Sequence, residues 1–243
     1  MSKGNIIAVI GDVHGCINTL EKIFNKLSRH SEISEYYCVG DMIDRGKYSK
    51  EVVEFCIRNS VRPVMGNHED MLLKAISKSD KLLGFLYKDS EHYYYNGGRE
   101  TQYSYIHSRL FSNFKKFSEE IKNTGHYDFI KNLPLKYEFK KVIISHAGII
   151  DGGDDVSIIW NRDIPLKLNE LQIFGHTPLN EIAYIKNYYA NIDTGCVYKR
   201  KLTAVIVDTD EGNIDEIIQE NYDPGDVEQC RVCRVCRVCY HCN

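Results

Sequence analysis

Several short apolar runs each end next to a glycine and an aspartate, an asparagine or a histidine, and this feature constrains the fold most. The first three such runs end in GDVHG (residues 11–15), GDMIDRG (residues 40–46) and GNHE (residues 66–69). After the first run, apolar residues recur at the spacing of one helix face, at Ile17, Leu20, Ile23, Phe24 and Leu27. This alternation of strands and helices predicts an α/β fold.

The two ends of the chain carry the clearest strand patterns. Near the N-terminus we expect strands over 6–10, 36–39 and 62–65, and helices over 17–28, 49–57 and 69–77. Strand patterns return over 142–145, 172–174, 182–185, 190–192, 202–207 and 213–218, and we expect the last four to form a meander. The stretch between them, about 78–135, is expected to form a mostly helical cap.

The length of 243 residues fits one large domain. We expect this domain over 1–222, followed by a Cys-rich tail over 223–243. The first apolar run is too short for a signal peptide or a membrane span, so we expect a cytoplasmic protein. A net charge of −3 gives no support for nucleic acid or an anionic membrane as a partner. The oligomeric state stays unknown at this point.

The strand ends carry side chains that suit divalent metals. Functional groups gather at the carboxyl ends of strands in an open α/β sheet, and two later runs end in SHAG (145–148) and GHT (175–177). Oxygen and nitrogen ligands of these types suit Mn, Fe or Zn. Two metals about 3.5–4 Å apart can activate a water and hold a phosphoryl oxygen. Arg45 and Arg162 could bind phosphate, and His68, oriented by Asp44, could protonate a leaving alkoxide.

In this order and spacing, the motifs resemble the signature of the phosphoprotein phosphatase family, the serine/threonine protein phosphatases among the metallophosphoesterases. IIWNRD (158–163), IFGHTP (173–178) and IDTGCVY (192–198) are similar to the bacterial and bacteriophage branch, which includes the phage lambda phosphatase. The resemblance covers about residues 6–207. It implies the metallophosphoesterase sandwich, in which two mixed β-sheets pack face to face and are flanked by helices.

The resemblance also implies a site. The side chains that would hold two divalent ions, with Asp41 bridging them, are Asp12, His14, Asp41, Asn67, His146 and His176. The first three would hold one ion, and Asp41 with the last three would hold the other. Mn²⁺ is the usual activating metal of bacterial members. His68, paired with Asp44, would be the general acid, and the phosphate would be bound by Arg45, Arg162 and Asn67. The implied reaction is in-line attack by a metal-bridging hydroxide, without a phosphoenzyme.

Three functions stay open. Asp44 and Glu69 favour phosphomonoesters, with phosphoserine and phosphothreonine in proteins as the leading substrates. Symmetrical diadenosine tetraphosphate hydrolases share the scaffold but tend to lack that aspartate and to have GNHD, so a dinucleoside polyphosphate is the alternative substrate. A non-catalytic metal-binding interaction module is the third hypothesis, which is disfavoured because no expected ligand is missing.

Residues beside the motifs have two interpretations each. Asp193 either supports the metal ligands or only ends a strand. Tyr198 is expected to face the active site, but Lys199-Arg200-Lys201 follow it where relatives often have Gly-Gly. This basic run either favours acidic substrates or is simply solvated. Asn96-Gly97-Gly98 with Thr101 resembles a stretch of bacterial relatives, although a plain turn explains it equally well.

The nine cysteines fall into two groups. Four are scattered through the body and are expected to be reduced and mostly buried: Cys16, Cys38, Cys56 and Cys196. The other five recur every third residue at the C-terminus: Cys230, Cys233, Cys236, Cys239 and Cys242. Their overlapping C-x-x-C pairs could hold an extra zinc ion. The alternatives are an inert repeat in a flexible tail and disulfides between chains.

Overall fold

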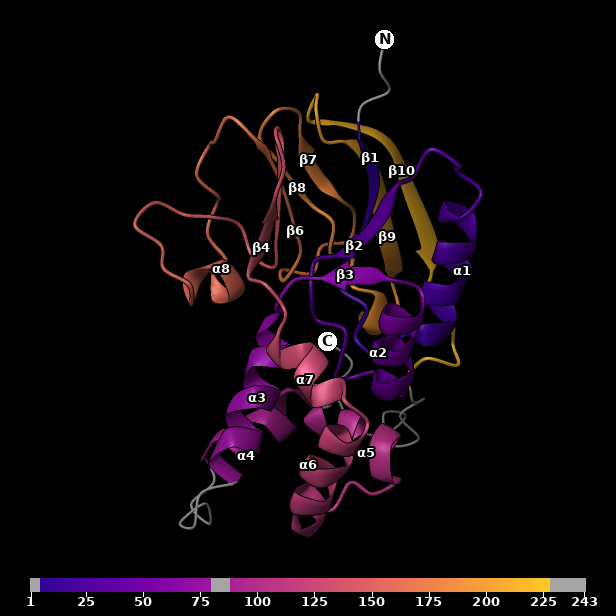
Figure 1. Cartoon of the computed structure of the whole chain (residues 1–243), viewed down its shortest axis with the longest axis vertical. Coiled ribbons are helices and arrows are strands. Elements are labelled where there is room, and N and C mark those ends of the chain that lie inside the picture. The colour runs from indigo at the N-terminus through magenta and orange to yellow at the C-terminus, as the bar shows by residue number, and fades with distance from the viewer. Residues whose placement is uncertain (1–4, 80–87, 228–243) are drawn as a thin grey trace.

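Two five-stranded sheets form the upper half of the molecule in the computed structural model, which describes residues 5–79 and 88–227 (Figure 1). The first sheet has the order β10-β9-β1-β2-β3. Its strands are β1 (Ile6–Ile10), β2 (Glu35–Cys38), β3 (Val61–Pro63), β9 (Lys201–Asp208) and β10 (Asn213–Asn221). The second sheet has the order β4-β5-β6-β8-β7. Its strands are β4 (Lys136–Glu138), β5 (Val142–Ser145), β6 (Leu171–Phe174), β7 (Ala183–Ile185) and β8 (Tyr189–Asn191).

Both sheets are mixed, as predicted. β1 pairs in parallel with β2, which pairs in parallel with β3, while β9 joins the other side of β1 antiparallel. In the second sheet, β5, β6 and β8 run parallel, with β4 and β7 as antiparallel edge strands. The carboxyl ends of each parallel set lie at one edge of its sheet, where the glycine-containing motifs begin.

The residues of β1 alternate between two cores because successive side chains of a strand point to opposite faces. Ile7 and Val9 lie between the two sheets, together with Val205 and Val207 of the neighbouring strand β9 and with Val142 and Ile144 of β5 in the second sheet. Ala8 and Ile10 pack on the other side against helical residues, among them Leu20, Ile23, Val52 and Phe55. Burying each large aliphatic side chain contributes about 1.5–3 kcal/mol, so the two cores fix the position of β1.

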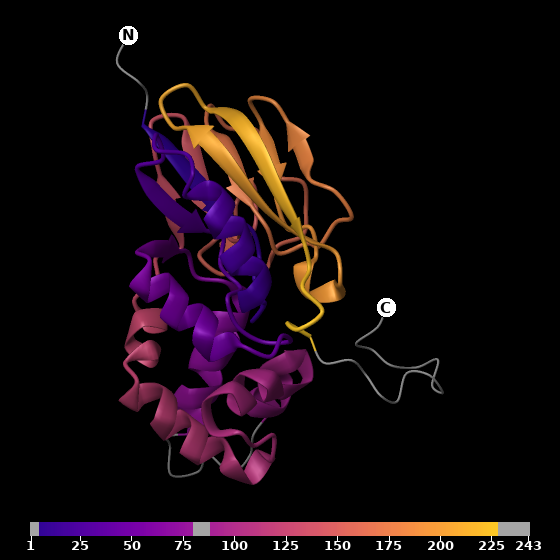
Figure 2. The ribbon, with the colours of Figure 1, turned by 90° about the vertical axis from the view of Figure 1, so that its right-hand side faces the viewer.

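Two helices cover the outer face of the first sheet. They are α1 (Ile17–Leu27) and α2 (Ser49–Arg58), both close to their predicted bounds. Figure 2 shows α1, in indigo, lying along the strands of this sheet. The buried residues of α1 include Leu20, Ile23 and Leu27, which are three of the five apolar positions that predicted the helix.

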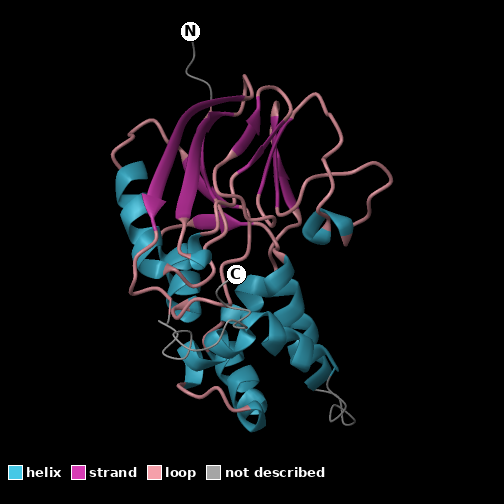
Figure 3. Ribbon diagram, turned by 180° about the vertical axis from the view of Figure 1, so that it is seen from behind, coloured by secondary structure: helices cyan, strands magenta, loops and turns pink. Residues whose placement is uncertain are grey.

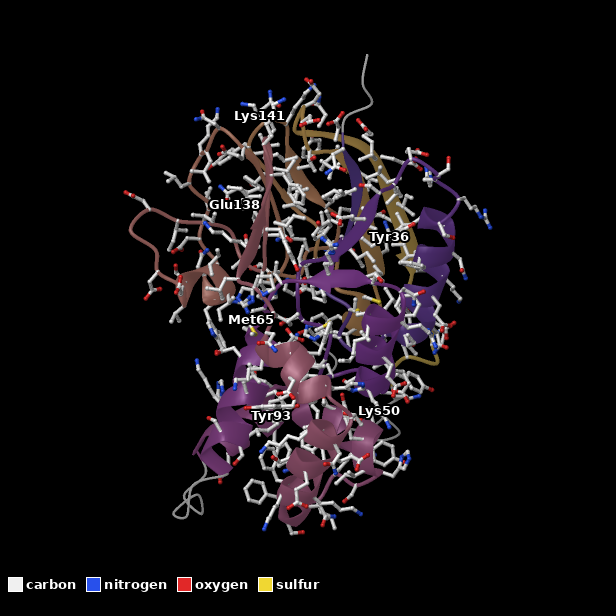
Figure 4. All side chains as sticks on the ribbon, in the orientation of Figure 1. Tyr36, Lys50, Met65, Tyr93, Glu138 and Lys141 are labelled. Carbon is white, nitrogen blue, oxygen red and sulfur yellow. The ribbon has the colours of Figure 1, made fainter. Side chains whose placement is uncertain are left out.

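The lower half of the molecule is helical, and Figure 3 shows it separated from the strands. Its elements are α3 (Asn67–Ser79), α4 (Lys88–Tyr93), the segment η1 (Tyr94–Gly98), which is kinked at Gly97, α5 (Arg99–Ile106), the 3₁₀ helix η2 (Phe111–Asn113), α6 (Phe114–Asn123) and α7 (His126–Lys131). In Figure 4, Tyr93 lies inside this region and Met65 at its junction with the sheets. A mostly helical cap is therefore confirmed in the described part of 78–135. No helix within the described residues has the length and apolarity needed to cross a bilayer.

One expectation about the C-terminal third was wrong. β7 pairs with β8 in the second sheet, and β9 pairs with β10 in the first, so the four strands form two hairpins rather than one meander. Apolar residues of both hairpins enter the same core between the sheets, so hydrophobic periodicity cannot assign them to different sheets. β4 and a short helix α8 (Ser157–Trp160) were not expected. β4 has three residues, none of them buried, and carries no strand pattern.

The chain stays attached to the body after β10. The backbone N–H of Asp226 donates to the carbonyl of Asp223 at 2.9 Å, which closes a turn, and the side chain of Asp226 is fully buried. The five cysteines at 230–242 lie outside the described residues, so the hypotheses about them stay predictions. The four body cysteines are reduced and buried, as expected.

Candidate active site

The turns after the parallel strands bring nine of the ten predicted residues together. Eight of them are buried, each less than a tenth exposed: Asp12, His14, Asp41, Asp44, Asn67, His68, His146 and His176. Arg45 is partly buried beside them, whereas Arg162 is exposed. Burying so many polar groups is costly unless they are paired or bind an ion, so the cluster is a candidate functional site.

The first group of side chains in the cluster comes from both sheets. Asp41 and Asn67 follow strands of the first sheet, and His146 and His176 follow strands of the second. Oδ1 of Asn67 is 3.0 Å from Nε2 of His146 and 3.0 Å from Nδ1 of His176, and these two nitrogens are 3.1 Å apart. Oδ1 of Asp41 lies 3.5 Å from Nε2 of His146. The other nitrogen of His146 donates to the carbonyl of Val39 at 2.8 Å, which leaves Nε2 with its lone pair. Four donor atoms thus converge, as a metal site requires.

A second group consists of Asp41, His14 and His68, so Asp41 belongs to both groups. Oδ2 of Asp41 lies 3.4 Å from Nε2 of His14 and 3.9 Å from Nε2 of His68. Nδ1 of His14 donates to the carbonyl of Ile43 at 2.8 Å, so its Nε2 also faces the cluster with a lone pair. The two groups could therefore hold two ions with Asp41 between them, in line with the predicted bridging role.

Asp12 does not belong to the second group, although the resemblance assigned it to that metal. Its carboxylate accepts the backbone N–H of His176 at 3.1 Å. Burial, followed by the charges of Asp193 and Asp41, raises the pKa of Asp12 well above its usual value. A cation beside Asp12 would offset this repulsion, so its surroundings suit a metal ligand, and the role stays a prediction.

The imidazoles have the protonation state that metals need. Burial lowers the pKa of His14 to about 3, that of His146 to about 4 and that of His176 to about 3. These rings are therefore neutral near pH 7, and neutral nitrogen is the metal-binding form. Carboxylate, amide and imidazole donors without a thiolate suit Mn, Fe or Zn, so the residues present fit two divalent ions.

Unusual backbone conformations build the cluster. Five of the predicted residues have a positive φ, between 46° and 72°: His14, Asp41, Asp44, Arg45 and His176. Such left-handed conformations cost about 1–3 kcal/mol each in residues with a side chain, and they concentrate at functional sites. A Cβ atom at Gly66 would overlap the carboxylate of Asp41, so this turn needs glycine beside the candidate ligand.

Asp44 and His68 form a buried pair. Oδ2 of Asp44 is 2.6 Å from Nδ1 of His68, while Nε2 of His68 has no hydrogen-bond partner among the described residues. Burial raises the pKa of Asp44 to about 8 and lowers that of His68 well below its usual value. Both shifts favour the neutral form of each partner in the metal-free protein, so the acid role rests on geometry: Nε2 of His68 has no partner in the described part of the chain and is positioned to reach a substrate.

Thr101 holds Asp44 in place from the cap. Its hydroxyl donates to Oδ1 of Asp44 at 2.5 Å and accepts the backbone N–H of Asp44 at 2.9 Å. The hydroxyl of Ser49 accepts the same N–H at 3.0 Å. The stretch around Thr101 is therefore part of the site and not a plain turn.

Arg45 is oriented by the same stretch. Its backbone N–H donates to the carbonyl of Gly97 at 3.2 Å, and its Nη1 lies 2.7 Å from Nε2 of His14. The guanidinium also lies over the ring of Tyr198, 5.5 Å from its centroid, which confirms that Tyr198 faces the site. Arg162 lies at the rim, where its positive charge adds to the effect of burial in lowering the pKa of His146 and His176.

Sequence reasoning missed the structural role of Glu69. Its buried carboxylate accepts the backbone N–H groups of Asp41 at 2.9 Å, Met42 at 2.9 Å, Ile43 at 3.4 Å and Gly66 at 3.1 Å. Burial, followed by the charges of Asp41 and Asp44, raises its pKa to about 8. Glu69 thus joins the loop that carries Asp41 to the turn that carries Asn67. The GNHE motif marked this residue, but nothing in it indicated the contacts.

The remaining ambiguous residues also have definite places. Asp193 is buried, its charge contributes to the raised pKa of Asp12, and its carboxylate accepts the N–H of Gly195 at 2.9 Å. Lys199 and Arg200 are exposed, and Lys201 pairs with Glu181 at 2.7 Å. The basic run is thus largely solvated.

Two mixed sheets with such a cluster at their strand ends define a metal-dependent phosphoesterase. A sequence model of the calcineurin-like phosphoesterases matches residues 6–218. The chain belongs to the calcineurin-like phosphoesterase family.

Known proteins similar to the chain differ in their substrates. The asymmetrical bis(5'-nucleosyl)-tetraphosphatase PrpE of Oceanobacillus iheyensis is 27% identical over 233 residues, covering 82% of this chain and 87% of the relative. Serine/threonine-protein phosphatase 2 of Salmonella typhimurium is 27% identical over 210 residues, covering 78% of this chain and 87% of the relative. Among solved structures, a metallophosphoesterase from Sphaerobacter thermophilus has a TM-score of 0.57 at 16% identity, covering 90% of this chain and 89% of that one, which shows the shared fold.

Proposed function

We propose that this phosphoesterase hydrolyses phosphomonoesters, with phosphoserine and phosphothreonine in proteins as its substrates. The observation that carries the proposal is the buried pair of Asp44 and His68, separated by 2.6 Å, with Nε2 of His68 left unpaired. We assign His68 as the general acid and Asp44 as the residue that orients its ring.

The leaving group explains why this pair favours phosphomonoesters. A serine or threonine alkoxide is a strong base, so its departure needs a proton, and a positioned acid contributes about 10²–10⁴-fold to such a step. A nucleotide that departs through a phosphate oxygen is a far weaker base and gains little from an acid. A buried histidine–aspartate pair that can protonate a leaving group therefore favours an alkoxide over a nucleotide as the leaving group.

The other assigned residues would bind metals and phosphate. Two divalent ions, for which Mn²⁺ is our proposal, would be held by Asp12, His14, Asp41, Asn67, His146 and His176. When bound, such ions supply Lewis acidity and lower the pKa of a water molecule. The guanidinium groups of Arg45 and Arg162 would bind the phosphoryl oxygens, because their fork matches phosphate geometry. Asn67 would contribute to the same contact.

A second candidate is hydrolysis of dinucleoside tetraphosphates. It is favoured by the name of the PrpE relative, which covers most of this chain at the same 27% identity as the serine/threonine phosphatase relative. The fold, metals and ligands would be the same, and the general acid would matter less.

A rate comparison on one preparation separates the candidates. Metal-stripped protein is resupplied with Mn²⁺ and given either a phosphoserine/phosphothreonine peptide or diadenosine tetraphosphate. We expect a higher kcat/KM on the peptide. A higher value on the dinucleotide would overturn the substrate assignment, and its products would separate symmetrical cleavage (two ADP) from asymmetrical cleavage (ATP and AMP). Asp41→Asn is the control, because loss of the bridging carboxylate should abolish activity that belongs to this protein.

A further inference from the structure

The segment after β10 returns to the start of α1 as a short strap, residues 223–227. Besides the turn bond from Asp226 to Asp223, the carboxylate of Asp223 accepts the N–H of Gly225 at 2.7 Å. The N–H of Asp223 donates to Oγ1 of Thr19 at 2.8 Å. The strap is therefore a defined turn that lies against the N-terminus of α1, although sequence composition suggested the beginning of a tail.

The carboxylate of Asp226 caps α1 from the other end of the chain. The helix lacks a cap of its own, because the side chain of Cys16 at the N-cap makes no capping bond. Oδ1 of Asp226 accepts from the backbone N–H and the side-chain amide of Asn18, at 2.9 and 2.8 Å. Oδ2 accepts from the backbone N–H and the hydroxyl of Thr19, at 2.9 and 2.6 Å. A buried anion with four donors at a helix N-terminus is well stabilised.

The strap also holds the loop that follows β2. The N–H of Lys47 donates to the carbonyl of Asp226 at 2.9 Å, and Nζ of Lys47 lies 3.1 Å from the carbonyl of Gly225. Lys47 is two residues after Arg45, at the end of the loop that carries Asp41 and Asp44. One aspartate therefore binds both the helix that follows the His14 turn and the loop that carries the phosphate-binding arginine.

These two segments are interlocked. The N–H of Gly15 donates to the carbonyl of Met42 at 2.8 Å, and the N–H of Gly46 donates to the carbonyl of His14 at 3.1 Å. The N–H of Tyr48 donates to the carbonyl of Gly15 at 3.1 Å. A small shift of either segment relative to the other would thus move His14, Asp41 and Arg45 apart. The strap opposes that shift because it is bonded both to α1 and to Lys47.

We propose that Asp226 is a positioning residue for phosphoester hydrolysis, which holds the His14 turn and the Asp41–Arg45 loop in register through α1 and Lys47. The inference depends on the phosphoesterase activity but not on which phosphate ester is the natural substrate. Asp226 touches no reacting atom. Its effect is on geometry, to which catalysis is sensitive because displacements near 1 Å can cost about 10²-fold in rate.

The test is Asp226→Asn in the full-length protein. The amide keeps the shape of the carboxylate but presents N–H groups to two of the four donors. In metal-free protein we expect faster amide hydrogen exchange in residues 12–19 and 41–48, with exchange in β9 and α6 unchanged. With Mn²⁺ and p-nitrophenyl phosphate, we expect kcat to fall by about ten- to a hundredfold at a temperature where the variant keeps its circular dichroism spectrum.

Two further variants make the test specific. Glu220→Gln removes a carboxylate that also pairs with α1, 2.7 Å from Nζ of Lys26, and it should change neither exchange nor kcat. Lys47→Met keeps the aliphatic stem but loses the bond to Gly225. It should therefore speed amide exchange in 41–48 alone. This variant tests the proposal if Asp226→Asn does not fold.

The results against the proposal are equally defined. Two results would mean that Asp226 only caps α1. One is amide exchange that rises evenly along the chain. The other is a lower melting temperature with unchanged kcat and unchanged exchange in 41–48. If the wild-type protein hydrolyses no phosphate ester, the proposed function fails, whereas faster exchange confined to the two loops would still support the coupling through Asp226.

Discussion

Nδ1 of His68 lies 2.6 Å from Oδ2 of Asp44, and both side chains are inaccessible to solvent. Asp44 is held in turn by the hydroxyl of Thr101, which lies on α5 of the cap. The cap is therefore structurally part of the site, because it fixes the residue that orients the candidate acid.

Replacing His68 with Asn should affect substrates according to their leaving group. On a phosphoserine peptide we expect kcat to fall by about 10²–10⁴-fold, because the alkoxide leaves without a proton. On p-nitrophenyl phosphate the loss should be much smaller, because the nitrophenolate is a weak base. Rates on both substrates, with metal content measured by elemental analysis, check this. Equal losses on both substrates, or normal turnover of the peptide, would contradict the assigned role.

Replacing Glu69 with Gln should destabilise the metal-free protein by about 1–3 kcal/mol, since leaving a buried backbone N–H without its acceptor costs about that much. Gln keeps only one acceptor oxygen, so its amide nitrogen leaves without an acceptor either the N–H groups of Asp41 and Gly66 or those of Met42 and Ile43. Urea unfolding measures the change, and a titration with Mn²⁺ should show weaker binding.

Glu54→Gln is the matched control for Glu69→Gln. Glu54 lies on α2, half exposed, with its carboxylate 4.0 Å from Nζ of Lys50. Its loss should change the free energy of unfolding by less than about 0.5 kcal/mol. Similar values for the two variants would mean that Glu69 does not hold the loop.

Replacing Gly97 with Ala should weaken phosphate binding. Gly97 has φ 107°, and a Cβ atom would lie 2.7 Å from Cγ and 2.8 Å from the backbone N of Arg45. The guanidinium should therefore be displaced, and we expect KM for a phosphate ester to rise about tenfold, equivalent to about 1.4 kcal/mol.

Gly125→Ala separates this clash from backbone strain. Gly125 also has a positive φ, 77°, but nothing lies within 4 Å of an added Cβ atom. Both alanine variants should lose about 1–2 kcal/mol of stability from the left-handed conformation. Only Gly97→Ala should raise KM, and an equal rise in Gly125→Ala would argue against a specific effect on Arg45.

Removing the imidazole of His176 should remove one of two metals. We expect the wild-type protein to bind two Mn²⁺ per chain and His176→Ala to bind one, by equilibrium dialysis. The single tryptophan gives a second signal, because the Trp160 ring lies 6.5 Å from that of His176. Paramagnetic Mn²⁺ should quench its fluorescence in the wild type and less so in the variant.

His30→Ala is the control for metal binding. His30 lies away from the cluster, beside Glu32 on the surface, with Nδ1 3.3 Å from the carboxylate. It should retain two Mn²⁺ and the full quenching. If the wild-type protein binds one ion, the two-metal assignment fails, whatever the variants do.

The strands that carry the motifs could be predicted well. β1 and β5 have the predicted bounds, and α1 and α2 differ from theirs by a residue, because their hydrophobic periodicity is strong and local. β4 could not be predicted, since a short exposed edge strand depends on its neighbour rather than on its own pattern. The meander was wrong because β8 and β9 present similar apolar residues to one shared core.

The sequence by itself determined which chemical groups the site contains. Each candidate ligand follows a strand in a short glycine-containing motif, so local pattern alone brings Asp12, Asp41 and His146 to the strand ends. Only the tertiary structure decided what holds these groups in place. Glu69 acts on Asp41 across 28 residues, Thr101 on Asp44 across 57, and Asp226 on Asn18 across 208. Contacts at such separations depend on how sheets, cap and strap pack together, and no local pattern encodes that packing.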